Sequence, residues 1–157
     1  MSTPTTHSSL SKPGFTLIGW DELYQRFVEP VSSPARRIYL LQRLQVFLRQ
    51  VEGLGLSVEV WFDGPWISNK PDPGEINLLL IFNRQDLSNL SAEQVDIFRK
   101  LVDDRPRLKA QYECVVYWVT NDETLLLADW EDTFSSSLLP LGPTKGIFKL
   151  YLNYSNA

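Results

Sequence analysis

The sequence predicts an α/β or α+β fold in which helices pack on a mixed β-sheet. Segments with helical periodicity alternate with short apolar segments of strand length, in the order two helices, two strands, helix, strand, helix, strand. The chain has 157 residues, which fits one domain, and 43% of them are hydrophobic, which is ample for one core. We therefore expect a single globular domain.

This domain is expected to span residues 15–157, after a flexible tail at residues 1–14. The tail, MSTPTTHSSLSKPG, is rich in Ser, Thr and Pro and has few apolar side chains. It holds the only histidine of the chain, His7. A lone histidine in a tail is far more often a bystander than a ligand or a base.

Two helices are expected before the first strand. In GWDELYQRFVEP the apolar residues recur at three- and four-residue spacing, and Pro30 ends the helix. The second helix starts with Ser33 as its N-cap and Pro34 at its first position, and it ends at Gly53. A solvated face is the favoured interpretation of its arginines, and a basic surface for a nucleotide or a partner is the alternative; they are Arg36, Arg37, Arg43 and Arg49.

The first two strands are predicted at residues 57–62 and 76–82. SVEVWF alternates and is rich in β-branched and aromatic residues, whereas INLLLIF is a continuous apolar run typical of a central strand covered on both faces. About a dozen residues join the two strands, which is too few for a crossover helix. We therefore expect an antiparallel or splayed hairpin.

A helix, a strand, a second helix and a last strand complete the order. In LSAEQVDIFRKLV, Ser91 and Gln94 have the spacing of a capping box at a helix start. QYECVVYWVT supplies a strand at residues 111–119, and NDETLLLADWEDTF begins a helix at Asn121 or Asp122. KGIFKLYL is the last strand.

Composition and charge exclude several classes of site and partner. The formal net charge of −4 and the pI of 5.0 disfavour nucleic acid as a partner. No apolar run approaches the roughly 20 residues of a membrane span, and the N-terminus lacks a signal-peptide core. The single cysteine, Cys114, favours a reducing cytoplasm, and its apolar neighbours favour a small buried residue over a nucleophile. The sequence has no Cys/His cluster for zinc, no Walker loop and no Ser-His-Asp set.

The candidate site lies between the first two strands, in WFDGPWISNKPDPGEINLLLIF. The backbone at Gly64 can approach a phosphate closely, because glycine has no side chain. Glu75 and Asn77 are two apart on a strand, so we expect their side chains on the same face. Two carboxylates placed that way hold Mg²⁺ against a triphosphate, but here the second residue is an amide. Turn chemistry alone, with Asn77 bonding a backbone group, is the alternative interpretation.

This stretch resembles the signature of the nucleotidyltransferase superfamily of polymerase-β type. That signature is a hydrophobic residue, Gly, then Gly or Ser, then nine to thirteen residues, then Asp-hydrophobic-Asp within a strand. Nine residues separate Pro65 from Glu75. The chain is also similar to a minimal bacterial branch of this superfamily in its WDE helix, its Lys-Pro-x-Pro loop and its Lys-Gly-Ile strand, at residues 20–22, 70–73 and 145–147. The resemblance implies a nucleotidyltransferase fold over most of residues 15–152.

The match departs from the signature at the positions that carry the chemistry. Pro65 replaces the Gly or Ser and has neither a hydroxyl nor an N–H for a phosphate. Glu75 and Asn77 replace the two aspartates. The third carboxylate of the family falls near Val115, and Glu113 is its candidate substitute, about 7 Å away along the strand. These departures disfavour two-metal catalysis, which depends on anionic metal ligands.

The resemblance therefore implies a catalytically inactive nucleotidyltransferase-like protein that needs no cofactor and acts by binding a protein. Small proteins of this fold often act beside a second protein in bacterial toxin–antitoxin or phage-defence operons, so we expect the partner to be encoded nearby. We expect the loop from Pro65 to Gly74 to be exposed. Trp66, in this loop, is the candidate partner-binding residue.

Two alternatives remain open at the level of sequence. One is an active enzyme that transfers a nucleotide to a protein or RNA, with Mg²⁺ held by Glu75 and by Glu113 or Asp63. The other is a nucleotide sensor in which Gly64, Lys70 and nearby arginines hold the phosphates.

Overall fold

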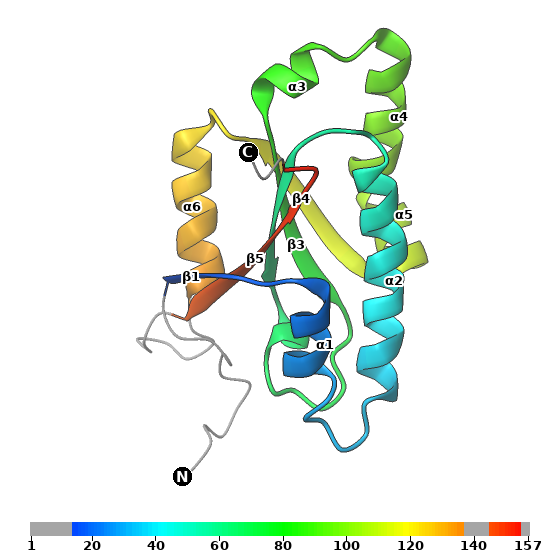
Figure 1. Cartoon of the computed structure of the whole chain (residues 1–157), viewed down its shortest axis with the longest axis vertical. Helices are drawn as coiled ribbons and strands as arrows, with labels where there is room; N and C mark the ends of the chain where they lie inside the picture. Colours follow the sequence, from blue (N-terminus) through cyan, green and yellow to red (C-terminus); the bar gives the residue numbers. More distant parts are fainter. Residues whose placement is uncertain (1–13, 137–144, 155–157) are drawn as a thin grey trace.

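The structure is a computed structural model that describes residues 14–136 and 145–154. Its strands are β1 (Gly14–Leu17), β2 (Val58–Asp63), β3 (Ile76–Phe82), β4 (Cys114–Thr120) and β5 (Gly146–Leu152). Its helices are α1 (Trp20–Phe27), α2 (Ala35–Glu52), α3 (Arg84–Ser88), α4 (Ala92–Val102), α5 (Arg105–Tyr112) and α6 (Thr124–Ser135), with a 3₁₀ turn, η1, at Pro65–Ile67. Figure 1 shows their arrangement.

The strands form one mixed five-stranded sheet in the order β1-β5-β2-β3-β4. The central strand β2 runs antiparallel to both β3 and β5, whereas β3 pairs with β4, and β1 with β5, in parallel. The expected mixed sheet and the antiparallel hairpin are therefore confirmed. In the hairpin register Asp63 lies opposite Asn77, so the candidate site sits at the end of the hairpin where the loop joins β2 to β3.

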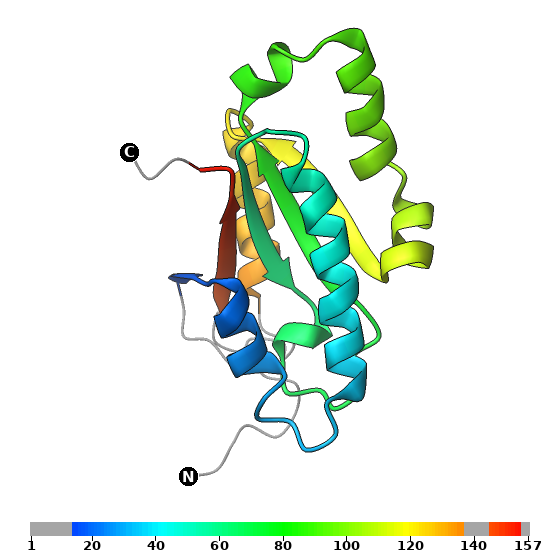
Figure 2. The ribbon, with the colours of Figure 1, turned by 45° about the vertical axis from the view of Figure 1, so that its right-hand side comes forward.

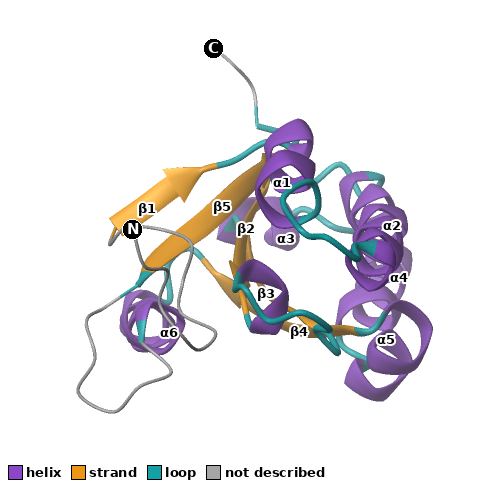
Figure 3. Ribbon diagram, turned by 90° about the horizontal axis from the view of Figure 1, so that it is seen from below, coloured by secondary structure: helices purple, strands orange, loops and turns teal. Residues whose placement is uncertain are grey.

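Helices cover the two faces of the sheet unequally. Figures 1 and 3 show α1, α2, α4 and α5 on one face and α6 on the other. Leu78, Leu80 and Phe82 of β3 belong to the large core under the first group, and Leu79 and Ile81 belong to the smaller core under α6. Because β3 is buried on both faces, its sequence is a continuous apolar run rather than an alternating one.

Several local signals act as predicted. Ser91 and Gln94 form a reciprocal capping box at the start of α4, with nitrogen–oxygen distances of 3.2 and 2.8 Å. The long helix α2 packs its apolar residues into the large core, with Leu44, Phe47 and Leu48 all 0% exposed.

Some predicted boundaries are wrong. Gly14, predicted to end the tail, is the first residue of β1; residues 1–13, with His7, lie outside the described residues. Pro34 is the N-cap of α2, one residue later than the predicted cap Ser33. The last acidic helix begins at Thr124 rather than at Asn121 or Asp122.

The predicted strand at residues 111–119 begins instead at Cys114, because helix α5 occupies the residues before it. The carboxylate of Asp104 caps α5 by accepting the backbone N–H of Arg107 at 3.2 Å, and a proline follows in the first turn. Glu113 then turns the chain into β4 with a left-handed φ of 54°. Strand β1 and helix α3 are not predicted from the sequence either. None of the described helices is long and apolar enough to cross a membrane.

Candidate functional site

The turn at the end of β2 depends on a glycine. Gly64 has a φ of +87°, and a Cβ at this position would lie 2.4 Å from the side-chain oxygen of Asn77. Both the backbone conformation and the contact therefore exclude a larger residue. Pro65 opens the 3₁₀ turn that follows.

The side chain of Asn77 packs against this glycine. Its Oδ1 atom is buried and accepts no hydrogen bond from any described residue. A buried acceptor without a donor costs about 1–3 kcal/mol. The expectation that Asn77 bonds a backbone group therefore fails for its oxygen.

Lys145 neutralises the acidic residue opposite Asn77. The ammonium group of Lys145, just before β5, forms an ion pair with the carboxylate of Asp63. These side chains are only 12% and 18% exposed, so the pair is largely shielded from water. The backbone N–H of Lys145 also donates to the carbonyl of Ser135 at 2.7 Å, which joins β5 to the end of α6.

Two further carboxylates near this end of the sheet have partners from the helices. Glu75, which lies just before β3, pairs with Lys109 of α5. Glu113 pairs with Arg36 of α2 at 2.8 Å, and Arg36 also donates to the carbonyls of Pro73 and Gly74 at 3.1 and 3.0 Å. The hydrogen bond from Arg36 lowers the pKa of the Glu113 carboxyl, and the same bond raises the pKa of Arg36.

The candidate metal ligands contact partners in different elements. Glu75 pairs with Lys109 of α5, Asn77 packs against Gly64, and Glu113 pairs with Arg36 of α2. Glu75 lies just before β3, which begins at Ile76, so of Glu75 and Asn77 only Asn77 lies in the strand. Val115 lies opposite Asn77 in the β3–β4 register, whereas Glu113 precedes that strand. Among the described residues, no group of three or more His, Cys, Asp or Glu side chains could hold a metal ion. The carboxylates Asp63, Glu75 and Glu113 are each paired with a cation of the chain, which opposes the Mg²⁺ binding that the active-enzyme alternative requires.

The expectation that Trp66 is exposed is wrong. Its side chain is 0% exposed, its ring centroid lies 5.1 Å from that of Phe27, and its indole N–H donates to the carbonyl of Arg37 at 3.2 Å. The position of Trp66 in a loop gave no sign of this burial. Trp66 belongs to the core and is not a contact residue.

Arg37 is buried with Trp66, which corrects its assignment to a solvated face. Its side chain is 1% exposed, and its guanidinium donates to four backbone carbonyls, which are those of Phe27, Trp66, Ser68 and Lys70. Burial lowers the pKa of Arg37, but the guanidinium of a buried arginine still keeps its positive charge. Figure 2 shows the loop after β2 beside the start of α2, where this contact forms.

The same contact fixes the backbone of Lys70, the candidate phosphate ligand. The Lys70 carbonyl accepts from Arg37 at 2.7 Å, and its N–H donates to the hydroxyl of Ser68 at 3.2 Å. The loop is therefore anchored from inside, although Pro71, Asp72 and Gly74 are exposed.

Cys114 is buried, as predicted. Its side chain is 0% exposed, and burial raises the pKa of the thiol to about 12. A thiol with this pKa is not a nucleophile near neutral pH.

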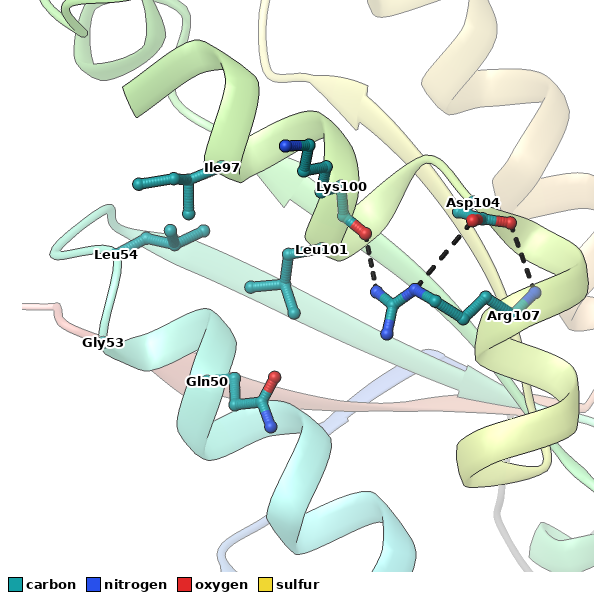
Figure 4. Close-up of a pocket in the computed structure, with 8 residues that line it drawn as sticks. All are labelled: Gln50, Gly53, Leu54, Ile97, Lys100, Leu101, Asp104 and Arg107. Atoms are coloured by element: carbon teal, nitrogen blue, oxygen red, sulfur yellow. Dashed lines mark hydrogen bonds and ion pairs between the residues drawn. The ribbon is translucent and has the colours of Figure 1, made fainter. Parts of the chain in front are cut away.

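A cavity of 680 Å³ lies between the end of α2 and helices α4 and α5, away from the glycine turn (Figure 4). Leu54, Ile97 and Leu101 line its apolar side. The guanidinium of Arg107 at its edge is held by the Lys100 carbonyl at 2.6 Å and by Asp104. The cavity includes none of the candidate site residues.

The chain belongs to a family of unknown function, DUF6932, whose model matches residues 3–150. Comparison with curated proteins and with solved structures found no match. The family assignment covers the whole described sheet except the end of β5.

Replacing Arg37 should destabilise the protein strongly. Arg37→Met keeps a long side chain but leaves four carbonyls without their donor, so we expect a loss of at least about 3 kcal/mol in the free energy of unfolding. Denaturant titration measures it. Arg49→Ala, an exposed arginine of the same helix, is the matched control and should change stability by less than about 0.5 kcal/mol. Similar losses in the two variants would contradict the role of Arg37.

The glycine turn can be tested by a double-mutant cycle. Gly64→Ala should cost about 2–4 kcal/mol, because a Cβ meets Asn77 and φ is positive. Adding Asn77→Ala should recover part of that loss, since it removes the contact but not the backbone strain. Gly74→Ala, whose added Cβ would meet no atom within 4 Å, is the control and should be nearly neutral. Purely additive effects of Gly64→Ala and Asn77→Ala would refute the contact.

The Glu113–Arg36 pair predicts a pH dependence of stability. Because the folded-state pKa of Glu113 is lowered, its contribution is present above the unfolded pKa of about 4.3 and is lost as the pH falls through the folded pKa. The side chains are 28% and 32% exposed, so screening leaves about 0.5–1 kcal/mol. Denaturant titrations between about pH 6 and pH 3 should show a smaller acid loss in Glu113→Gln than in the wild type. Parallel curves would contradict the prediction.

Proposed function

We propose that this chain is a catalytically inactive, nucleotidyltransferase-like protein that acts by binding a protein partner. One observation carries the proposal. The three carboxylates that are candidate metal ligands, Asp63, Glu75 and Glu113, are each paired with a cation of the chain itself, namely Lys145, Lys109 and Arg36. The fourth position, Asn77, is a neutral amide.

This arrangement opposes metal-dependent transfer on electrostatic grounds. Phosphoryl and nucleotidyl transfer depend on metal ions that neutralise the charge developing on the phosphates, and Mg²⁺ requires anionic oxygens in near-octahedral order. A divalent ion entering here would have to displace Lys145 from a shielded pair with Asp63, or be repelled by it. Asn77 could supply only a neutral oxygen in compensation.

Without metal-dependent transfer, binding a protein partner is the role that we propose for this chain. The resemblance to small bacterial nucleotidyltransferase-like proteins supports a place in a toxin–antitoxin or phage-defence system, with a cytoplasmic partner encoded nearby. The net charge of −4 supports a protein over nucleic acid as that partner.

Nucleotide binding and transfer test the catalytic half of this proposal. The wild type should bind Mg²⁺-ATP and Mg²⁺-GTP at least about tenfold more weakly in calorimetry than a variant that carries Glu75→Asp, Asn77→Asp and Pro65→Ser and that also loses the competing cations through Lys109→Ala and Lys145→Ala. The physical reason is that each charged contact is worth about 1.5–3 kcal/mol. The wild type should also transfer no label from any nucleoside triphosphate.

The matched control for this comparison is Asp96→Asn, which changes one carboxylate on the exposed face of α4 and should leave nucleotide binding unchanged. Label transfer by the wild type that is lost in Glu75→Ala would overturn the proposal and identify Glu75 as a catalytic ligand.

A further inference from the structure

The apolar inner face of helix α6 packs against the sheet. Leu127, Trp130 and Phe134 pack on the sheet, with the Trp130 ring centroid 4.8 Å from Tyr117 and that of Phe134 6.3 Å from Trp61. Figure 3 shows α6 on the opposite face of the sheet from α1, α2, α4 and α5. Its outer side is therefore not covered by these helices.

The outer side of α6 exposes two leucines. Leu125 is 84% exposed and Leu126 is 45% exposed, and Ala128, which neighbours Leu125 at i+3, is also exposed. Isolated exposed leucines are ordinary, but these two are consecutive, and neither belongs to the core clusters of the described residues. We call Leu125, Leu126, Ala128, Asp129, Glu131 and Asp132 the α6 surface.

The negative charges of the α6 surface lie near the C-terminal end of the helix, where they destabilise it. Asp129, Glu131 and Asp132 are exposed in the C-terminal half of the helix, where the helix dipole favours cations. The last turns of α1, α2, α4 and α5 carry Arg or Lys, whereas that of α6 carries none. Within residues 14–136 and 145–154, these three carboxylates form no ion pair.

We propose that the α6 surface docks on a cationic protein surface, in which exposed apolar side chains are flanked by Lys and Arg. This inference rests on the proposed protein-binding function and names the docking surface and the chemistry of the partner. Charge complementarity indicates the chemistry of the partner. Its apolar residues would contact Leu125 and Leu126, and its cations would neutralise the carboxylates of α6 that form no ion pair within the described residues. Phosphate backbones and anionic membranes are repelled by the same carboxylates.

At its cavity between α2 and α4, a second copy of the chain meets this description less well. That cavity is bordered by Lys100 and Arg107 (Figure 4). These cations already pair with Asp96 and Asp104, respectively. They are therefore less available to the carboxylates of α6 than unpaired cations on a different protein.

A peptide probe tests the chemistry of the surface. We would titrate the full chain into a fluorescent amphipathic helical peptide of leucine and lysine at low salt and follow anisotropy. Leu125→Ser with Leu126→Ser, and separately Asp129→Asn with Glu131→Gln and Asp132→Asn, should each weaken binding at least about fivefold. Oligolysine without leucine should bind at least about fivefold more weakly than the probe.

Helix α4 supplies the matched controls. Ile97→Ser removes an apolar side chain that is 55% exposed, and Glu93→Gln with Asp96→Asn removes exposed carboxylates. These variants should keep the wild-type affinity within about twofold. Equal losses in the α4 and α6 variants, equal binding of oligolysine, or no binding of the probe would overturn the proposal.

Thermal melting separates loss of binding from loss of fold. Neutralising the three carboxylates should leave the melting temperature unchanged or raise it by about 1–4 °C, because it removes repulsion at the helix C-terminus. If a variant with serine at positions 125 and 126 unfolds, the neutralised variant still decides the outcome. A fall in melting temperature on neutralisation would show that these carboxylates stabilise the fold, which contradicts the inference.

The native partner provides the second test. The full chain is co-expressed with the proteins encoded beside it, and complexes are measured by size-exclusion chromatography with light scattering. A stoichiometric complex that survives in the α4 variants and is lost in the α6 variants supports the inference. A complex that survives in all variants overturns the α6 surface but leaves the protein-binding function standing. No complex with the wild type counts against the proposed function, and self-association abolished by the α6 changes would identify a second copy as the occupant and overturn the inference.

Discussion

The guanidinium of Arg37 joins three separate parts of the chain at one buried point. From helix α2 it reaches the end of α1 through the Phe27 carbonyl and the loop between β2 and β3 through the carbonyls of Trp66, Ser68 and Lys70. The Trp66 indole N–H donates to the Arg37 carbonyl, so reciprocal hydrogen bonds join the β2–β3 loop to helix α2. A buried cation without a carboxylate is stable here because several oriented dipoles replace its water.

The position of the glycine turn follows from this anchor. With the loop fixed on α2, Gly64 lies against Asn77, and Arg36, the neighbour of Arg37, holds the carbonyls of Pro73 and Gly74 and the carboxylate of Glu113. Lys109 and Lys145 complete the set of cations at this end of the sheet. The carboxylates Asp63, Glu75 and Glu113 are thus each paired with a cation of the chain, whereas the exposed carboxylates of α6 form no ion pair within the described residues.

Periodic and capped segments could be predicted from the sequence, because their signals are local. The run INLLLIF marks a doubly buried strand, the short link before it requires a hairpin, and Ser91 with Gln94 marks a helix start. The burial of Arg37 and Trp66 could not be predicted, since each depends on a partner about thirty residues away in the chain. Residues 111–113 resemble the start of a strand, whereas the cap at Asp104 and the left-handed Glu113 make them the end of a helix. The ion pairs of Glu75 with Lys109 and of Glu113 with Arg36 could not be predicted either, because these residues are far apart in the sequence and come together only in the folded chain.

We propose that the cations of the chain take the place of a metal ion at the glycine turn. Electron paramagnetic resonance of Mn²⁺ tests it directly, because the signal of the free aqueous ion diminishes on binding. We expect equimolar wild-type protein to leave the signal of submillimolar Mn²⁺ unchanged, with or without ATP, beyond the effect of ATP alone. Stoichiometric binding of Mn²⁺ by the wild type that disappears in Glu75→Ala would contradict it.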